Sequence, residues 1–138
     1  MILTYVDASV LIGTMRGQGD LLTRALAVLD DPERAFAASS FLKLEVLPQA
    51  RFHKRAAEVE FYERFFSAVS VWATDLTAIS DAALEEASRY GIEAMDALHV
   101  AAAAAVGAQE LVTLEKPTRT IHRARAVKVV SLHPEATR

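Results

Sequence analysis

Short apolar runs alternate along the chain with longer segments that have helical spacing. Residues 2–6 form an apolar run that stops at Asp7, and this pattern predicts a strand that leads directly into a helix. Similar short runs predict the remaining strands, which lie at residues 35–38, 71–74, 111–114 and 127–132. The pattern therefore predicts about five short strands that are apolar enough to be covered on both faces.

The segments between these runs carry apolar residues at intervals of three and four, which is typical of helices. Ser39 or Ser40 is expected to cap a helix that carries Glu45, and Pro48 is expected to kink or end that helix. The other helices are predicted at residues 8–15, 21–29, 56–69, 80–90 and 96–106.

Three of these predicted helices have distinctive sequences. The helix at residues 80–90 has Ser80 as its expected N-cap and Gly91 as its natural stop. The helix at residues 96–106 is apolar at almost every position, so we expect it to be buried on most sides. The helix at residues 56–69 carries an aromatic stripe that we assign to the core, made of Phe61, Tyr62, Phe65 and Phe66.

Strands separated by helices favour a parallel sheet, because parallel neighbours need a crossover connection. The predicted fold class is therefore α/β, with a three-layer α/β/α arrangement around a central parallel sheet. The chain has 138 residues, which is enough for one core, and we expect a single domain over residues 1–138.

Composition narrows the range of functions. The chain has no cysteine, so thiol chemistry, disulfides and cysteine-ligated metal sites are excluded. Its apolar start is interrupted by Asp7 and lacks a basic region, so neither a signal peptide nor a membrane span is expected, and we expect a cytoplasmic protein. The net charge of -3 gives no global attraction to nucleic acid.

Several acids follow predicted strands, where the loops of a parallel sheet form sites. Asp7, Asp75 and Glu115 follow strands, Asp96 opens the most apolar helix, and Glu45 lies between apolar neighbours. Each acid alone has a simple structural explanation, such as capping a helix or lying in its first turn. Together, however, the carboxylates of Asp7, Glu45, Asp96 and Glu115 would repel one another. A hard cation such as Mg²⁺ or Mn²⁺ would resolve that repulsion.

Four segments resemble the signature blocks of PIN-domain ribonucleases, especially the toxins of VapBC-type toxin–antitoxin systems. They are YVDASVLI, SSFLKLEVL, GIEAMDALHVAAA and LVTLE, in this order. The resemblance extends from Ile2 to the last strand, and its most specific part begins at Asp96. It implies a five-stranded PIN-like domain, Mg²⁺- or Mn²⁺-dependent cleavage of RNA, an antitoxin partner and a homodimer.

Carried over by position, the resemblance assigns Asp7, Glu45 and Asp96 as the first three acids of a metal site. Glu115 stands where the family pattern usually has aspartate, and its extra methylene shifts the carboxylate by about 1.5 Å. Ser9 matches a small hydroxyl residue near the family's site, and Thr113 matches its usual threonine.

Basic residues after the fourth acid are candidates for contact with an RNA backbone. Lys116, Arg119 and Arg123 adjoin Glu115 in the sequence, and we assign them to RNA binding. A second basic group, formed by Arg16, Arg51, Lys54 and Arg55, fits RNA contact and an ordinary charged surface equally well. His99 lies near Asp96 on the same helix face, and we expect it to be a buried histidine bonded to a carbonyl or carboxylate.

Two other functions fit part of this pattern. The first is a PIN-like RNA- or protein-binding module with weakened catalysis, which Glu115 in place of aspartate would explain. The second is a receiver-type phosphoacceptor domain, which needs an acidic pair at the end of the first strand and a lysine after the last. Only Asp7 is present at that position, so the ribonuclease reading is preferred.

Overall fold

The computed structural model describes residues 1–137, and within them a five-stranded parallel sheet forms the centre of the molecule. The strands are β1 (Ile2–Val6), β2 (Arg34–Ser39), β3 (Val71–Ala73), β4 (Glu110–Thr113) and β5 (Val129–Ser131). Their order across the sheet is β3-β2-β1-β4-β5, and every adjacent pair is parallel. The predicted α/β class and the parallel sheet of about five strands are confirmed.

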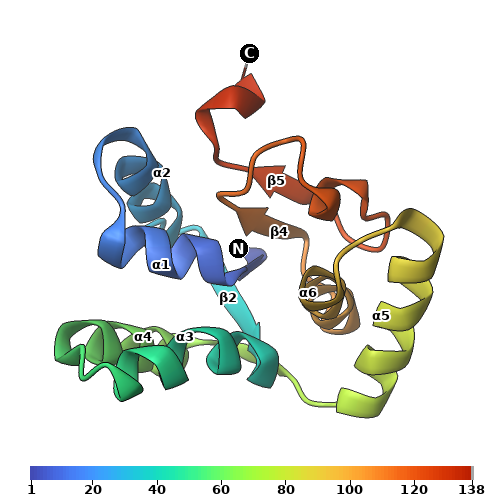
Figure 1. Ribbon diagram of the computed structural model, residues 1–138, viewed down its shortest axis with the longest axis horizontal. Coiled ribbons are helices and arrows are strands. Elements are labelled where there is room, and N and C mark those ends of the chain that lie inside the picture. Colours follow the sequence, from blue (N-terminus) through green and yellow to red (C-terminus); the bar gives the residue numbers. More distant parts are fainter. Residues whose placement is uncertain (138) are drawn as a thin grey trace.

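Helices cover both faces of this sheet, as Figure 1 shows. One face is covered by α1 (Ala8–Arg16), α2 (Gly19–Leu29), α3 (Ser40–Phe52) and α4 (Ala56–Ala68). The other face is covered by α5 (Leu76–Tyr90), α6 (Ala94–Ala105) and the 3₁₀ helix η1 (Thr120–Arg123), and the described chain ends in the 3₁₀ helix η2 (Pro134–Thr137). The three-layer prediction is therefore correct.

The alternation of strand side chains produces two separate apolar cores. Tyr5 faces the core beneath α5 and α6, whereas the next residue, Val6, faces the core beneath the other four helices. Ala37 and Ala38 divide in the same way, as do Leu111 and Val112. This division follows from the two-residue period of a strand, which sends successive side chains to opposite faces.

The order of the strands reverses between β1 and β4. The chain adds β2 and β3 on one side of β1 and then returns to place β4 on its other side. Thr4, Tyr5 and Val6 pair with Glu110, Leu111 and Val112, so the ends of both strands lie side by side. Such a switch point opens a crevice beyond the carboxyl ends of the strands, where α/β proteins commonly place their sites.

Pro48 does not end α3, which corrects one of the two outcomes, a kink or an end, that the sequence predicted for it. The helix continues through it to Phe52, although proline cannot donate the backbone hydrogen bond of an interior position. Leu42, Val46, Leu47 and Ala50 are buried against the sheet side of α3, while Pro48 lies on its exposed side. Burial of this apolar face compensates for the missing hydrogen bond.

The start of α5 also differs from the prediction. It begins at Leu76, and its cap is Asp75, whose carboxylate accepts a 3.1 Å hydrogen bond from the backbone N–H of Ala78. Ser80 lies inside the helix. The end of α5 agrees with the prediction, because Gly91 closes it in the left-handed conformation with φ 69°.

The aromatic stripe of α4 is only partly buried. Tyr62 and Phe66 lie in the core, whereas Phe61 and Phe65 pack at its margin. The α6 helix is buried over most of its length, as expected from its composition. Among residues 1–137, no helix has both the length and the apolar character that crossing a bilayer requires.

Candidate functional site

Asp7 lies at the point where β1 ends and α1 begins. Its side chain caps α1, because Oδ1 accepts a 3.0 Å hydrogen bond from the backbone N–H of Ser9 and a second, short one from the Ser9 hydroxyl. The residue is only 4% exposed. The simple structural reading of Asp7 as a helix cap is therefore confirmed, and its carboxylate lies buried at the switch point of the sheet.

The hydroxyl groups of Ser9 and Thr113 connect this junction to the end of β4. They lie 3.2 Å apart, and Ser9 Oγ also accepts a 2.9 Å hydrogen bond from the backbone N–H of Leu114. Thr113 Oγ1 accepts a 3.0 Å hydrogen bond from the backbone N–H of Glu115. These contacts fix the backbone segments that carry Asp7 and Glu115 beside each other.

Asp96 approaches the same edge from the other face of the sheet. It occupies the first turn of α6, whose positive dipole end favours an acid, and it is partly buried. The pKa of Asp96 is raised to about 6, chiefly by burial and next by the negative charge of Asp7, with smaller contributions from Glu93 and Glu115. The first-turn position in α6 would favour a charged Asp96, so its raised pKa shows that burial and the neighbouring acids outweigh the helix dipole.

The pKa of Asp7 is also raised, chiefly because burial penalises its charged form. Hydrogen bonds from the hydroxyls of Ser9 and Thr113 lower it, and the negative charge of Glu115 raises it. Asp7, Asp96 and Glu115 thus act on one another as like charges. The fold brings these three acids, from three different elements, into one electrostatic neighbourhood.

Glu45 reaches the site from α3. Its Oε1 makes a short hydrogen bond to Nε2 of His99, which is 1% exposed on α6. The other ring nitrogen of His99 lies 2.7 Å from the hydroxyl of Tyr5. The prediction that His99 is a buried histidine bonded to a carboxylate is confirmed. The sequence reading did not identify Tyr5, although a hydroxyl-bearing residue in an otherwise apolar strand is a signal for a buried polar contact.

A groove joins several of the predicted residues on the surface. Its volume is about 540 Å³. Its lining includes three of the predicted residues, Ser9, Glu45 and Glu115, together with Arg16. Arg16 forms a 2.8 Å ion pair with Glu58 of α4, so its charge is already compensated. Asp7 and Asp96 are not among the residues that line this groove.

The acids differ in whether a basic group compensates them. Within residues 1–137, neither Asp7 nor Asp96 forms an ion pair with lysine or arginine. Glu115 has a 3.6 Å contact with Arg119, which also lies 3.5 Å from Glu93. Arg119 therefore compensates the charge of Glu115, a hydrogen bond to His99 holds Glu45, and Asp7 and Asp96 have neither kind of basic partner.

The described side chains do not form a ready-made cation site. No three histidine or acidic residues of the described chain are arranged to hold one metal ion. The oxygen-only donor set nevertheless fits Mg²⁺ or Mn²⁺, and Asp7 and Asp96 are the carboxylates that such a cation would neutralise. Repulsion between carboxylates keeps them apart when no cation lies between them. The contacts of Glu45 with His99 and of Glu115 with Arg119 are consistent with this separation.

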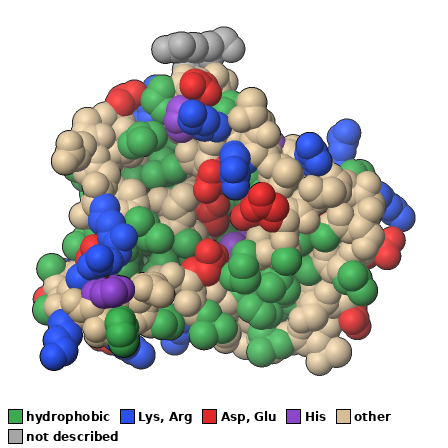
Figure 2. All heavy atoms as spheres, viewed as in Figure 1, with side chains coloured by type: hydrophobic (Ala, Val, Ile, Leu, Met, Phe, Trp, Pro, Cys, Tyr) green, Lys and Arg blue, Asp and Glu red, His purple; other side chains and the backbone are tan. Residues whose placement is uncertain are grey.

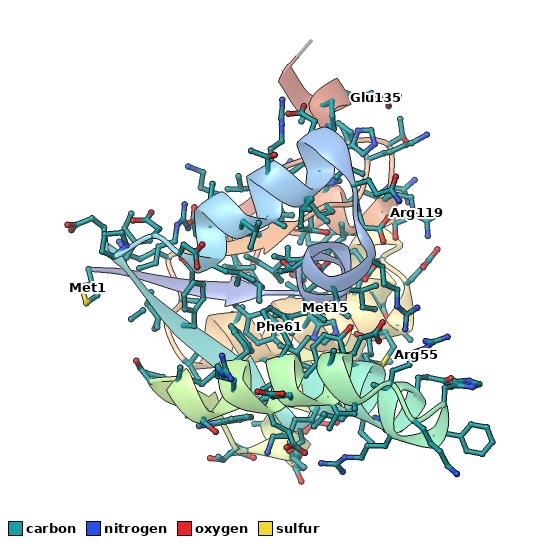
Figure 3. All side chains as sticks on the ribbon, turned by 90° about the vertical axis from the view of Figure 1, so that its left-hand side faces the viewer. Met1, Met15, Arg55, Phe61, Arg119 and Glu135 are labelled. Atoms are coloured by element: carbon teal, nitrogen blue, oxygen red, sulfur yellow. The ribbon has the colours of Figure 1, made fainter. Side chains whose placement is uncertain are left out.

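Figure 2 shows acidic side chains gathered in the middle of one face, with lysine and arginine side chains around them. Figure 3 shows β1 running toward this face, with Arg119 and Arg55 at the same edge and Met1 at the opposite one. Of the three residues assigned to RNA binding, Lys116 is exposed, Arg119 contacts two glutamates, and Arg123 donates a 3.3 Å hydrogen bond to the carbonyl of Gly91.

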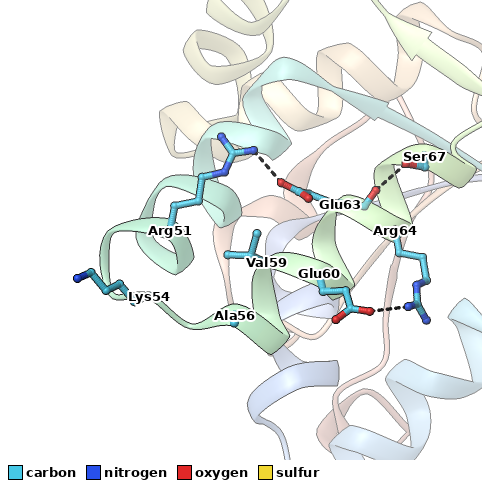
Figure 4. A pocket seen from close by; sticks show the side chains of 8 residues that line it. All are labelled: Arg51, Lys54, Ala56, Val59, Glu60, Glu63, Arg64 and Ser67. Atoms are coloured by element: carbon cyan, nitrogen blue, oxygen red, sulfur yellow. Dashed lines mark hydrogen bonds and ion pairs between the residues drawn. The ribbon is translucent and has the colours of Figure 1, made fainter.

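A second hollow, of about 580 Å³, lies between α3 and α4 (Figure 4). Two of its basic side chains are paired with acids of α4, because Arg51 pairs with Glu63 at 3.0 Å and Arg64 pairs with Glu60 at 2.7 Å. Both pairs are exposed to water and contribute little stability. This hollow contains none of the predicted site acids.

Comparisons with known proteins agree with the fold. Among solved structures, VapBC2 from Rickettsia felis, bound to a DNA fragment from its promoter, matches with 15% identity and a TM-score of 0.69, covering 94% of this chain and 98% of that one. A toxin–antitoxin complex from Klebsiella pneumoniae matches with 20% identity and a TM-score of 0.68 over the same shares. FitAcB from Neisseria gonorrhoeae matches with 17% identity and a TM-score of 0.63, covering 94% of this chain and 97% of that one.

At these identities the structural matches establish a shared fold. Among curated protein sequences, none matches this chain. The family model of the PIN domain matches residues 4–121, a span that includes Asp7, Glu45, Asp96 and Glu115. The chain therefore belongs to the PIN domain family.

Proposed function

We propose that this protein is a metal-dependent endoribonuclease and the toxin component of a type II toxin–antitoxin pair. The carrying observation is the cluster of like charges at the switch point of the sheet. The negative charge of Asp7 raises the pKa of Asp96, and that of Glu115 raises the pKa of both. Neither Asp7 nor Asp96 has a lysine or arginine partner in residues 1–137. Such a cluster is stable as charged carboxylates only when a cation neutralises it.

Asp7, Glu45 and Asp96 would hold Mg²⁺ or Mn²⁺, and Glu115 would reach the cation through its longer side chain or through water. A bound divalent cation supplies Lewis acidity, which lowers the pKa of water and stabilises charge on a phosphodiester. Ser9 and Thr113 hold the carboxylate of Asp7 in place through their hydroxyl groups. A carboxylate of the cluster that is not engaged with the cation accepts a proton from the attacking water.

We propose RNA as the substrate and an antitoxin as a partner because of the family and of the basic residues that follow Glu115. Lys116, Arg119 and Arg123 lie on the segment that follows Glu115 and would contact the phosphates of RNA. The structural neighbours include complexes of toxins with antitoxins, which supports an antitoxin partner for this chain. The homodimer is proposed from the family resemblance alone. An RNA-cleaving toxin of this kind would act in the cytoplasm.

RNA cleavage by the purified protein tests this proposal. We expect cleavage with Mg²⁺ or Mn²⁺, none with a chelator, and a loss of at least about 100-fold in the Asp7→Asn variant, because the variant keeps the shape but not the charge of a metal ligand. Asp81→Asn is the matched control, because Asp81 is an exposed residue of α5. Equal cleavage by the wild type and the Asp7→Asn variant would refute the proposed role of the site.

A binding module with weakened catalysis is the second candidate function. It is favoured by the contact between Glu115 and Arg119 and by the lack of a ready-made cation arrangement in the described residues. Calorimetric titration with Mn²⁺ separates the two candidates. A site tighter than millimolar supports the ribonuclease, whereas weaker or undetectable binding supports the binding module.

A further inference from the structure

A chain of buried hydrogen bonds ends on Glu45. It begins at the hydroxyl of Ser39 at the end of β2, which lies 2.7 Å from the hydroxyl of Tyr5 in β1. The Tyr5 hydroxyl lies 2.7 Å from Nδ1 of His99 in α6, and Nε2 of His99 contacts Oε1 of Glu45 in α3. Ser39 and Tyr5 are 0% exposed and His99 is 1% exposed. These contacts connect four elements of the fold.

The chemistry of the two ends sets the direction of this chain. The carboxylate of Glu45 can only accept, so Nε2 of His99 carries the proton and donates it. At the other end, Ser39 Oγ accepts a hydrogen bond of 3.4 Å from the backbone N–H of Leu42, which caps α3. A neutral imidazole then accepts at Nδ1 from the Tyr5 hydroxyl, and the oxygen of Tyr5 accepts from the hydroxyl of Ser39. Every donor in this series of hydrogen bonds then has an acceptor.

A protonated imidazole of His99 would reverse the direction of the hydrogen bonds between His99, Tyr5 and Ser39. Nδ1–H would donate to Tyr5, Tyr5 would donate to Ser39, and the proton of Ser39 would need another acceptor. Among the described residues, the hydrogen-bond partners of Ser39 Oγ are Tyr5 and the N–H of Leu42, and the latter cannot accept. A buried hydroxyl with an unused proton is unfavourable. The contacts therefore favour neutral His99 with its proton on Nε2.

This arrangement controls the side chain of Glu45. A glutamate has three rotatable side-chain bonds, and a free one loses that freedom when it binds a ligand. His99 already holds Oε1 of Glu45, and no described residue is hydrogen-bonded to Oε2. Glu45 is one of the residues that line the groove. Partners that orient a ligating side chain commonly change metal affinity about 10- to 100-fold when they are removed.

We propose that His99, Tyr5 and Ser39 are positioning residues that hold Glu45 in the groove as a preoriented ligand for a divalent cation. This inference rests on the proposed function, because it concerns the same cation site. It assigns a role to three buried polar residues that would otherwise be only structural. Ser39 and Tyr5 act through His99, and His99 acts through Glu45.

Calorimetric titration of the wild-type protein and its variants with Mn²⁺ tests this role. We expect His99→Leu to weaken Mn²⁺ binding about 10- to 100-fold, because Glu45 loses its anchor. His99→Gln should restore most of that affinity, because its side-chain amide can donate to Glu45 from a similar position. Tyr5→Phe should weaken binding by a smaller factor, because it removes the donor that keeps Nδ1 of His99 in its acceptor form.

Tyr62→Phe is the matched control for Tyr5→Phe. Tyr62 is also buried, but its hydroxyl is the one buried side-chain polar atom of the described residues without a hydrogen-bond partner. Removing this hydroxyl should leave Mn²⁺ affinity unchanged. Thermal unfolding of each variant confirms that the compared proteins are folded.

Nitrogen-15 NMR of the imidazole in the wild type gives a second readout that needs no substitution. We expect the Nε2–H tautomer at neutral pH. The Nδ1–H tautomer, or equal Mn²⁺ affinity of His99→Leu and the wild type, would overturn the inference while leaving the proposed function in place. A wild type that binds no Mn²⁺ would overturn the proposed function instead. The tautomer of His99 would then still show whether its imidazole donates a hydrogen bond to Glu45.

Discussion

At the scale of single residues, Asp7 combines a helix cap with an electrostatically unfavourable burial of its carboxylate. Its Oδ1 caps α1, which satisfies a backbone N–H that the helix itself leaves free. The same group is buried beside other acids, which raises its pKa. Capping fixes where the carboxylate lies, and burial makes its charge costly without a counterion. The structural and functional readings of Asp7 are therefore compatible.

Asp96 leads to a prediction about stability and pH. Its pKa is raised from 3.8 to about 6 in the folded protein, so the folded state binds the proton more tightly than the unfolded state. The stability of the metal-free wild type should therefore fall as pH rises from about 4 to about 6. Asp96→Asn should flatten this decrease and raise the unfolding free energy at pH 7 by about 1 kcal/mol, a value discounted for the partial exposure of Asp96.

Urea unfolding at pH 4.5 and pH 7 in the presence of a chelator measures this effect. Mn²⁺ should then stabilise the wild type and have less effect on the variant, because the variant lacks one charged ligand. A variant that is less stable than the wild type at pH 7 would contradict the prediction, since it would mean that the charge of Asp96 is favourable without a cation.

At the scale of elements, α3 carries Glu45 toward the site despite an unfavourable residue in its interior. Pro48 removes a backbone hydrogen bond and crowds the carbonyl four residues earlier, that of Leu44. Leu44 and Pro48 are both exposed, so water can solvate the carbonyl that loses its partner. The helix is held instead by its buried side and by the cap at Ser39.

Pro48→Ala should therefore stabilise the protein. Alanine restores the hydrogen bond to the carbonyl of Leu44, and part of this gain is offset because the unfolded chain becomes more flexible. We expect an increase in the unfolding free energy of about 1 kcal/mol, measured by urea unfolding. Gln49→Ala is the neighbouring control, and it should change stability by less than about 0.5 kcal/mol. A loss of stability in Pro48→Ala would show that proline is needed for the local geometry of α3.

At the scale of the whole molecule, the order of the strands creates the site. Asp7 follows β1, Glu115 follows β4, and these two strands are neighbours at the point where the chain reverses its direction across the sheet. Asp96 and Glu45 come from helices on opposite faces of the sheet. Basic side chains lie around the acidic centre on the same face, as Figure 2 shows.

This charge distribution predicts how RNA binding responds to salt. The double variant Lys116→Ala, Arg123→Ala should weaken the binding of single-stranded RNA and lower the slope of log affinity against log salt by about 0.7 for each lost phosphate contact. Fluorescence anisotropy without divalent cations measures both quantities. Arg64→Ala, on α4 and paired with Glu60, is the control. An unchanged slope in the double variant would exclude Lys116 and Arg123 from the RNA contact.

The sequence pointed to the acids at the strand ends, but it gave no information on which partners the acids and His99 contact. The strand ends at Asp7 and Glu115 are local features, because an apolar run that stops at an acid can be read without knowing the fold. The contact between Glu45 and His99 joins residues 54 positions apart, and the one between Tyr5 and His99 joins residues 94 positions apart. Local patterns carry no information on such pairings, which depend on how α3 and α6 pack against the sheet.

The sequence by itself determined the alternation of strands and helices, the burial of α6 and the stop at Gly91, because spacing, apolarity and backbone freedom act over a few neighbouring residues. Only the tertiary structure decided that α3 continues through Pro48 and that the acids share one electrostatic neighbourhood. Those outcomes depend on surfaces that become buried when distant segments meet, and on charges that interact only after the sheet has brought them together.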